Sequence, residues 1–172
     1  MSDLADARRA LKITEIYCRD ETVRVLESVT PPLWPDCGRT QFKMVTRVLK
    51  DLEIEHEEAG TDGASSVRLL EVEFVGSVRC LPKVEEPDSA EPEALLSIEV
   101  KLGLLYQVTA ECSKESLEEF IRLNVPYHAI PYWREYVHSA CTRRRFPPIT
   151  VPLYTQALDR GGAPQRESKD ES

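Results

Sequence analysis

Cysteine and histidine are the side chains of this 172-residue chain best suited to nucleophilic or metal chemistry. The five cysteines are separated by 19, 43, 32 and 29 positions. No C-x-x-C motif occurs, and no Cys/His pair has the spacing of zinc ligands. We therefore expect no metal site and no disulfide framework, with the cysteines serving as small, reduced apolar side chains. They are Cys18, Cys37, Cys80, Cys112 and Cys141.

The one pairing that could support catalysis is His138 with Cys141, three positions apart on an expected helix. A Cys–His nucleophile pair also needs a third group to orient the base, and nothing in the sequence supplies one. The phosphate-loop, dinucleotide-binding, H-E-x-x-H and G-x-S-x-G motifs are all missing from the sequence. We expect no enzymatic activity and no cofactor. An enzyme or small-ligand binder using Cys141 and His138 is the remote alternative.

The overall composition indicates which classes of partner and which cellular location to expect. Apolar residues make up 41% of the chain and charged residues 30%, with a formal net charge of −8. This acidic balance argues against a nucleic-acid partner, and the one basic run, Arg143 to Arg145, suits the C-terminus of a helix. No apolar run approaches the ~20 residues of a membrane span, and the N-terminus does not read as a signal peptide. We expect a cytoplasmic protein without membrane insertion.

Alternating apolar and polar residues predict four long strands. The first contains a break in its period at Glu15, which is typical of a β-bulge. In the second strand, the apolar residues are all even-numbered, so they are predicted to lie on one face. In the third strand, Glu71 and Glu73 are predicted to lie on a solvent-exposed face. The connections show no helical pattern, so we predict an antiparallel meander. The predicted strands span 10–25, 41–55, 67–80 and 94–108. The apolar parity of the second comprises Phe42, Met44, Val48, Leu52 and Ile54.

The last third of the chain predicts helices that cover the apolar face of this sheet. A capping box at 116–119 opens a short helix that ends near Leu123, and a main helix follows over 126–145 with a kink at Pro131. The fold class is therefore α+β, a four-stranded antiparallel sheet of long strands followed by C-terminal helices. We predict a mobile N-terminus over 1–9, a single domain over 10–158 and a disordered tail over 159–172.

Two segments resemble the SecB family of export chaperones. They are 11–20, LKITEIYCRD, and 130–148, IPYWREYVHSACTRRRFPP. The strand over 96–106 also looks like the last long strand of that family. The predicted elements occur in the family's order over 10–158.

The resemblance implies an ATP-independent holdase that binds unfolded polypeptides or preproteins in long surface grooves. SecB-like proteins assemble as dimers of dimers, so it implies a homo-oligomer, most simply a tetramer, without catalytic residues or metal. Some family members instead stabilise the antitoxin of a toxin–antitoxin system, and this is the alternative. The export motor SecA would bind weakly, because Arg24 and Ser97 depart from the docking pattern of motor-coupled members.

The resemblance and the expected faces together suggest particular site residues. The client-binding groove would be lined by Trp34, Phe42, Met44 and Leu102. From residue type alone, Trp34 could equally be a core residue that plugs a proline-ordered loop. Asp20 and Glu99 would form an acidic partner-docking face. Tyr132 and Tyr136 would lie at the oligomer interface, because this aromatic pair is displaced from the stripe that packs on the sheet.

Overall fold

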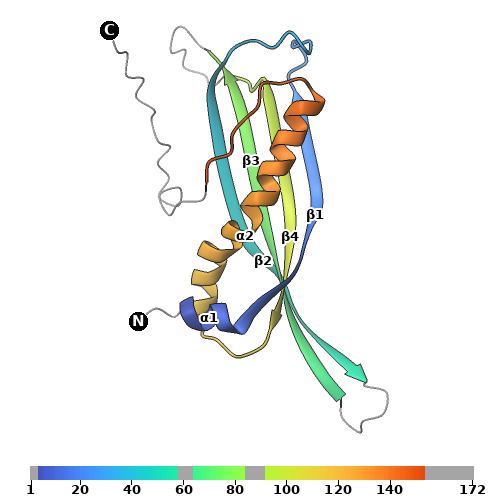
Figure 1. Ribbon diagram of the computed structural model, residues 1–172, viewed down its shortest axis with the longest axis vertical. Helices are drawn as coiled ribbons and strands as arrows, with labels where there is room; N and C mark the ends of the chain where they lie inside the picture. The colour runs from blue at the N-terminus through green and yellow to red at the C-terminus, as the bar shows by residue number, and fades with distance from the viewer. Residues whose placement is uncertain (1–3, 58–63, 84–91, 154–172) are drawn as a thin grey trace, which may run out of the picture.

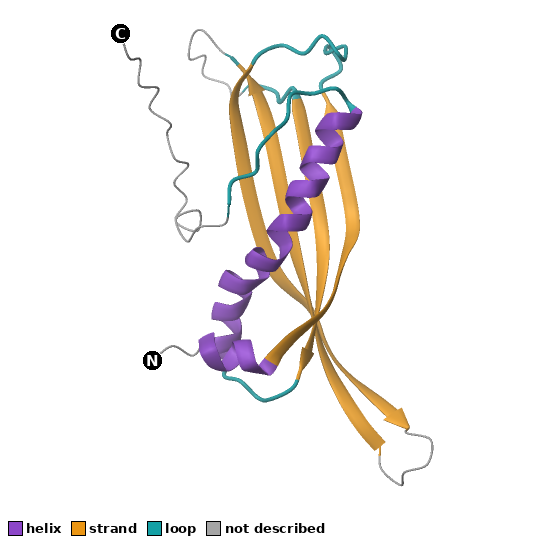
Figure 2. Ribbon diagram, viewed as in Figure 1, coloured by secondary structure: helices purple, strands orange, loops and turns teal. Residues whose placement is uncertain are grey.

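A sheet of four long strands and one long helix lying across it make up the fold (Figures 1 and 2). The computed structural model describes residues 4–57, 64–83 and 92–153. The predicted α+β class and the four antiparallel strands are confirmed. The elements are α1 (Leu4–Ala10), β1 (Leu11–Val25), β2 (Cys37–Glu57), β3 (Ala64–Pro82), β4 (Leu96–Val108) and α2 (Lys114–Arg143).

The strand order in the sheet is β1-β4-β3-β2. Strands β2, β3 and β4 form the predicted meander, but β1 pairs with β4 and not with β2. The segment 26–36 therefore crosses from one edge of the sheet to the other, and the prediction of a simple meander is wrong for β1. Alternation within a strand predicts which side chains share a face. It does not predict which strand lies beside it, because β1 could pair at either edge of the three-stranded meander.

Bulges in β1 and β2 decide which side chains share a face. The predicted bulge in β1 is confirmed at Thr14, and a second one places Arg19 out of register. In β2, Val48 pairs with Val72 but Lys50 already pairs with Glu71, so Leu49 is the extra residue. One extra residue turns every later side chain to the opposite face.

The predicted single apolar face of β2 is therefore wrong beyond Leu49. Phe42, Met44 and Val48 share the face that packs on α2, here called the inner face. Leu52 and Ile54 lie with Glu71 on the opposite, outer face, because they follow the bulge.

Helix α2 is continuous where two helices were expected. It begins after the N-cap Ser113, whose hydroxyl accepts a hydrogen bond from the Ser116 backbone, one turn earlier than predicted. Pro126 and Pro131 both lie inside it. Each proline removes one backbone hydrogen bond, and burial of neighbouring side chains holds the helix together across them. The helix axis bends in its N-terminal half (Figure 1).

Two further features differ from expectation. A mobile N-terminus was expected, but residues 4–10 form the helix α1. Two of its side chains, Ala7 and Ala10, are buried. Cys37 and Cys80 form a disulfide with Cα atoms 5.9 Å apart, although all cysteines were expected to be reduced. Pairing of β2 with β3 brings these cysteines together across 43 positions of sequence.

The described residues contain no helix long and apolar enough to cross a membrane.

Candidate functional site

The inner face of the sheet is covered unevenly. Trp133 of α2 is the central contact, and its ring lies edge-on to Phe74 of β3 and to Phe42 of β2. The inner-face side chains of β3 and β4 beneath the helix are fully buried, for example Val72 and Leu104. The helix crosses the sheet diagonally (Figure 1), and side chains of the edge strand β2 such as Val48 stay partly exposed.

This uncovered part of β2 forms an apolar strip. Phe42 is 36% exposed and Val48 is 44% exposed, and half-buried Met44 lies between them on the same face. We call Phe42, Met44 and Val48 the β2 strip. Exposed apolar side chains gathered on one face are typical of an interaction site. The structure thus places two of the predicted groove residues, Phe42 and Met44, on the same face as Val48. The alternation of β2 could have predicted Val48 as a third site residue.

Trp34 and Leu102 lie elsewhere. The Trp34 indole donates a hydrogen bond to the carbonyl of Arg144, 3.1 Å away, and its ring meets Phe146 edge-on. Trp34 therefore anchors the crossing segment 26–36 to the C-terminal end of α2. Leu102 is 1% exposed beneath the helix, so it is a core residue here and does not line an open groove.

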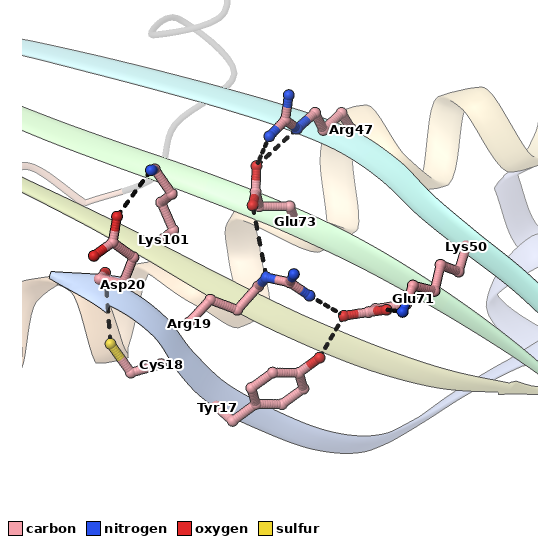
Figure 3. A network of polar contacts seen from close by, with 9 residues as sticks. All are labelled: Tyr17, Cys18, Arg19, Asp20, Arg47, Lys50, Glu71, Glu73 and Lys101. Carbon is pink, nitrogen blue, oxygen red and sulfur yellow. Dashed lines mark hydrogen bonds and ion pairs between the residues drawn. The ribbon is translucent and has the colours of Figure 1, made fainter.

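The outer face carries a network of charged side chains (Figure 3). Arg19 forms ion pairs with both Glu71 and Glu73. Arg47 holds Glu73 at 2.6 Å from the other side, and Lys50 lies 3.9 Å from Glu71. Both carboxylates are buried, at 6% and 4% exposure, so the prediction that they face solvent is wrong. Burial of charge is tolerated here because each carboxylate is matched by cations.

Tyr17 completes the cover over this network. Its ring from β1 lies against Gly103 of β4 and reaches across to donate a hydrogen bond to Glu71 of β3. A Cβ at position 103 would come within 2.4 Å of the ring, so only glycine leaves room for it. The hydrogen bond to Glu71 raises the pKa of Tyr17.

Asp20 and Glu99 both lie on the outer face, where the predicted docking surface would be, and each carboxylate has a partner within the chain. Lys101 lies 2.9 Å from the Asp20 carboxylate and holds its pKa below the usual value. Glu99 accepts a hydrogen bond from Ser77 at 3.2 Å. The negative potential of this pair is therefore partly cancelled within the chain.

The two tyrosines proposed for an oligomer interface differ in exposure. Tyr132 is 47% exposed on α2. Tyr136 is half-buried, and a hydrogen bond with Cys18 of β1 raises its pKa to about 12. Tyr132 is thus the one of the pair whose ring is open to a partner.

The groups weighed for catalysis are not arranged as an active site. Cys141 is 1% exposed and its burial raises the pKa of the thiol, which disfavours the thiolate that would act as nucleophile. His138 lies exposed on the helix surface. Among the residues that the structure describes, no group of three or more His, Cys, Asp or Glu side chains could hold a metal ion.

Comparison with known proteins adds to this geometry. No family model matches the chain. Its sequence is similar to the protein-export protein SecB of Afipia carboxidovorans, with 24% identity over 166 residues that cover 87% of this chain and 98% of that protein. Its fold is similar to that of the Mycobacterium tuberculosis SecB-like chaperone, solved in complex with a ChAD peptide from an antitoxin. That match has a TM-score of 0.60 and 15% identity, and covers 89% of this chain and 96% of the other. The resemblance to SecB is therefore confirmed in sequence and in fold.

Proposed function

We propose that this SecB-like chain is an ATP-independent chaperone that holds unfolded or non-native polypeptides and keeps them from folding or aggregating. The observation that carries this is the β2 strip, a partly exposed apolar surface that borders the buried core of the inner face. Burial of such surface against a client is favourable by roughly 25 cal/mol per Å². The binding needs no cofactor or nucleotide.

The chaperone would act in the cytoplasm as a homotetramer, a dimer of dimers. Tyr132 supports an oligomer, because a large aromatic ring that is 47% exposed on the central helix suits a subunit contact. Preproteins handed on for export are the clients that the SecB relative suggests.

A second candidate is a chaperone dedicated to one antitoxin. The structural neighbour bound to an antitoxin peptide favours it. The same strip would serve both roles, and only the range of clients would differ. Suppression of aggregation across several unrelated denatured proteins would support the general role, and activity toward a single antitoxin would support the dedicated one.

The test is a light-scattering assay of a denatured model client diluted into buffer without ATP. Val48 and Val45 offer a matched pair, since both are 44% exposed on β2 but they face opposite sides of the sheet. We expect wild type to suppress aggregation, Val48→Ser to weaken suppression several-fold, and Val45→Ser to stay close to wild type. Equal effects of the two substitutions would contradict the β2 strip as the client site, and wild type without suppression would refute the proposed function.

A further inference from the structure

The outer face of β2 and β3 is basic, although the chain as a whole carries a net charge of −8. Between 43 and 50, the register turns three cations of β2 toward this face, and one cation of β3 lies beside them. A fifth, from β1, joins them through ion pairs with Glu71 and Glu73. We call these five cations the outer basic patch: Arg19, Lys43, Arg47, Lys50 and Arg79.

The carboxylates within this patch lie beneath its cations (Figure 3). Glu71 and Glu73 are 6% and 4% exposed. The side chains of Arg47 and Lys50, which pair with them, are 63% and 58% exposed. A partner that approaches from solvent therefore meets the cations first. Because their ion pairs already order these side chains, less conformational entropy is lost when a partner binds.

Lys43 extends the patch beyond this network. Its side chain is exposed, and it lies opposite Ser77 of β3. In the parts of the chain that the structure describes, Lys43 forms no ion pair. On the β4 side, Glu99 borders the patch and accepts a hydrogen bond from Ser77, and Lys101 lies two positions further along the same face. Lys43 therefore keeps its charge for a partner.

Exposed apolar side chains lie among these cations. Val45 is 44% exposed on the same face, between Lys43 and Arg47. Beyond Lys50 the next outer-face residue of β2 is Leu52, which is 42% exposed. Apolar side chains framed by arginine and lysine are typical of a protein–protein interface.

These features favour a protein partner over a nucleic acid. Surfaces that bind single-stranded nucleic acid combine cations with aromatic rings on which the bases stack. Tyr17, the aromatic residue of the network, is half-buried and donates its hydrogen bond to Glu71. The net charge of −8 also repels a polyanion at long range, whereas a folded protein can present its acidic residues to the patch alone.

We propose that the outer basic patch docks a folded partner protein through an acidic surface of that partner. Opposite charges across an interface speed association and select the partner. The patch and the β2 strip lie on opposite faces of the sheet, so a partner can bind while a client occupies the strip. This docking surface has the opposite sign to the acidic one expected around Asp20 and Glu99, and it adds to the proposed function without depending on it.

A negatively supercharged green fluorescent protein is the probe, because it is folded and cannot bind as an unfolded client. The same protein with its ordinary surface is the reference. Each is titrated with the full chain at low and physiological salt, and binding is followed by fluorescence anisotropy. Lys43→Glu is the test variant. Lys12→Glu is the matched control, because Lys12 is an exposed outer-face lysine on the opposite edge strand and its reversal changes the net charge equally.

We expect the acidic probe to bind and the reference protein not to bind, with an affinity that falls as salt screens the charges. Lys43→Glu should weaken binding about fivefold at low salt, since it replaces an attraction by a repulsion, and Lys12→Glu should weaken it by less than about twofold. In methyl NMR spectra of the valine-labelled chain, the probe should shift the signals of Val45 and leave those of Val48 unchanged. These two valines are equally exposed on opposite faces.

Four results would overturn the proposal. They are no binding of the acidic probe at low salt, and equal effects of the two lysine substitutions. The third is a single-stranded oligonucleotide that binds more tightly than the probe and depends on Lys43, which would make the patch a nucleic-acid surface. The fourth is a lower assembly mass of Lys43→Glu in light scattering, which would make it a contact between copies of the chain. Failure of the wild type to suppress aggregation would refute the proposed function and leave this docking surface standing.

Discussion

The indole of Trp133 lies directly against the backbone of Gly76, so close that a Cβ at position 76 would come within 2.6 Å of the ring. Gly76 is in β3 and Trp133 is in the middle of α2, so this contact sets how closely the helix approaches the sheet. The same contact holds Trp133 beside Phe42, where the covered core meets the β2 strip.

Gly76→Ala should therefore lower the free energy of unfolding by about 1–3 kcal/mol, the usual effect of forcing one extra carbon into a packed core. Urea unfolding followed by circular dichroism measures it. The same substitution in a Trp133→Leu background should be much less destabilising, because the atoms that clash are gone. Equal losses in both backgrounds would show that the indole is not the obstacle.

His128 should make stability depend on pH. It is half-buried with Nδ1 2.9 Å from the Tyr106 hydroxyl, and burial lowers its pKa. Near and below pH 6.5 the unfolded chain then binds more protons than the native state, so the free energy of unfolding falls as the pH decreases. We expect His128→Gln to lose less stability than wild type between pH 7.5 and 5.5 in urea titrations. An identical loss in both proteins would assign the pH dependence to other groups.

The assembly should have the mass of a tetramer in multi-angle light scattering at micromolar concentration. If Tyr132 lies at the interface, Tyr132→Asp should reduce that mass by placing an unpaired charge there. Tyr127→Asp is the matched control, since Tyr127 is 68% exposed on the same helix. A monomeric wild type would exclude the tetramer, and a tetrameric Tyr132→Asp would exclude this residue from the interface.

Binding to SecA should be weak or absent. Lys101 neutralises part of the charge of Asp20, so the outer face steers a basic partner less strongly than unpaired carboxylates would. SecA of the same organism is titrated against wild type and the Asp20→Lys/Glu99→Lys variant at low and physiological salt. Tight wild-type binding at physiological salt would contradict this prediction, and loss of client binding in the variant would show that these carboxylates support the fold or the client site.

The sequence by itself determined the class of fold, the two faces of β4 and the two faces of β2 before Leu49. Strict alternation in β4 defines its buried side without any tertiary information. The break in alternation at Glu15 predicted a bulge, and the structure has it one position earlier, at Thr14. The same alternation placed Phe42 and Met44 together, because neighbours two apart on a strand always share a face.

Only the tertiary structure decided which strand lies beside which and what covers each face. No local signal marks Leu49 as a bulge, yet that residue moves Leu52 and Ile54 to the outer face. Pairing across 43 positions joined Cys37 to Cys80. The burial of Glu71 likewise depends on Tyr17 and Arg19, which reach it from β1 across β4. Such contacts depend on strand order and helix placement, which arise from packing of the whole chain and leave no trace in the periodicity of any one segment.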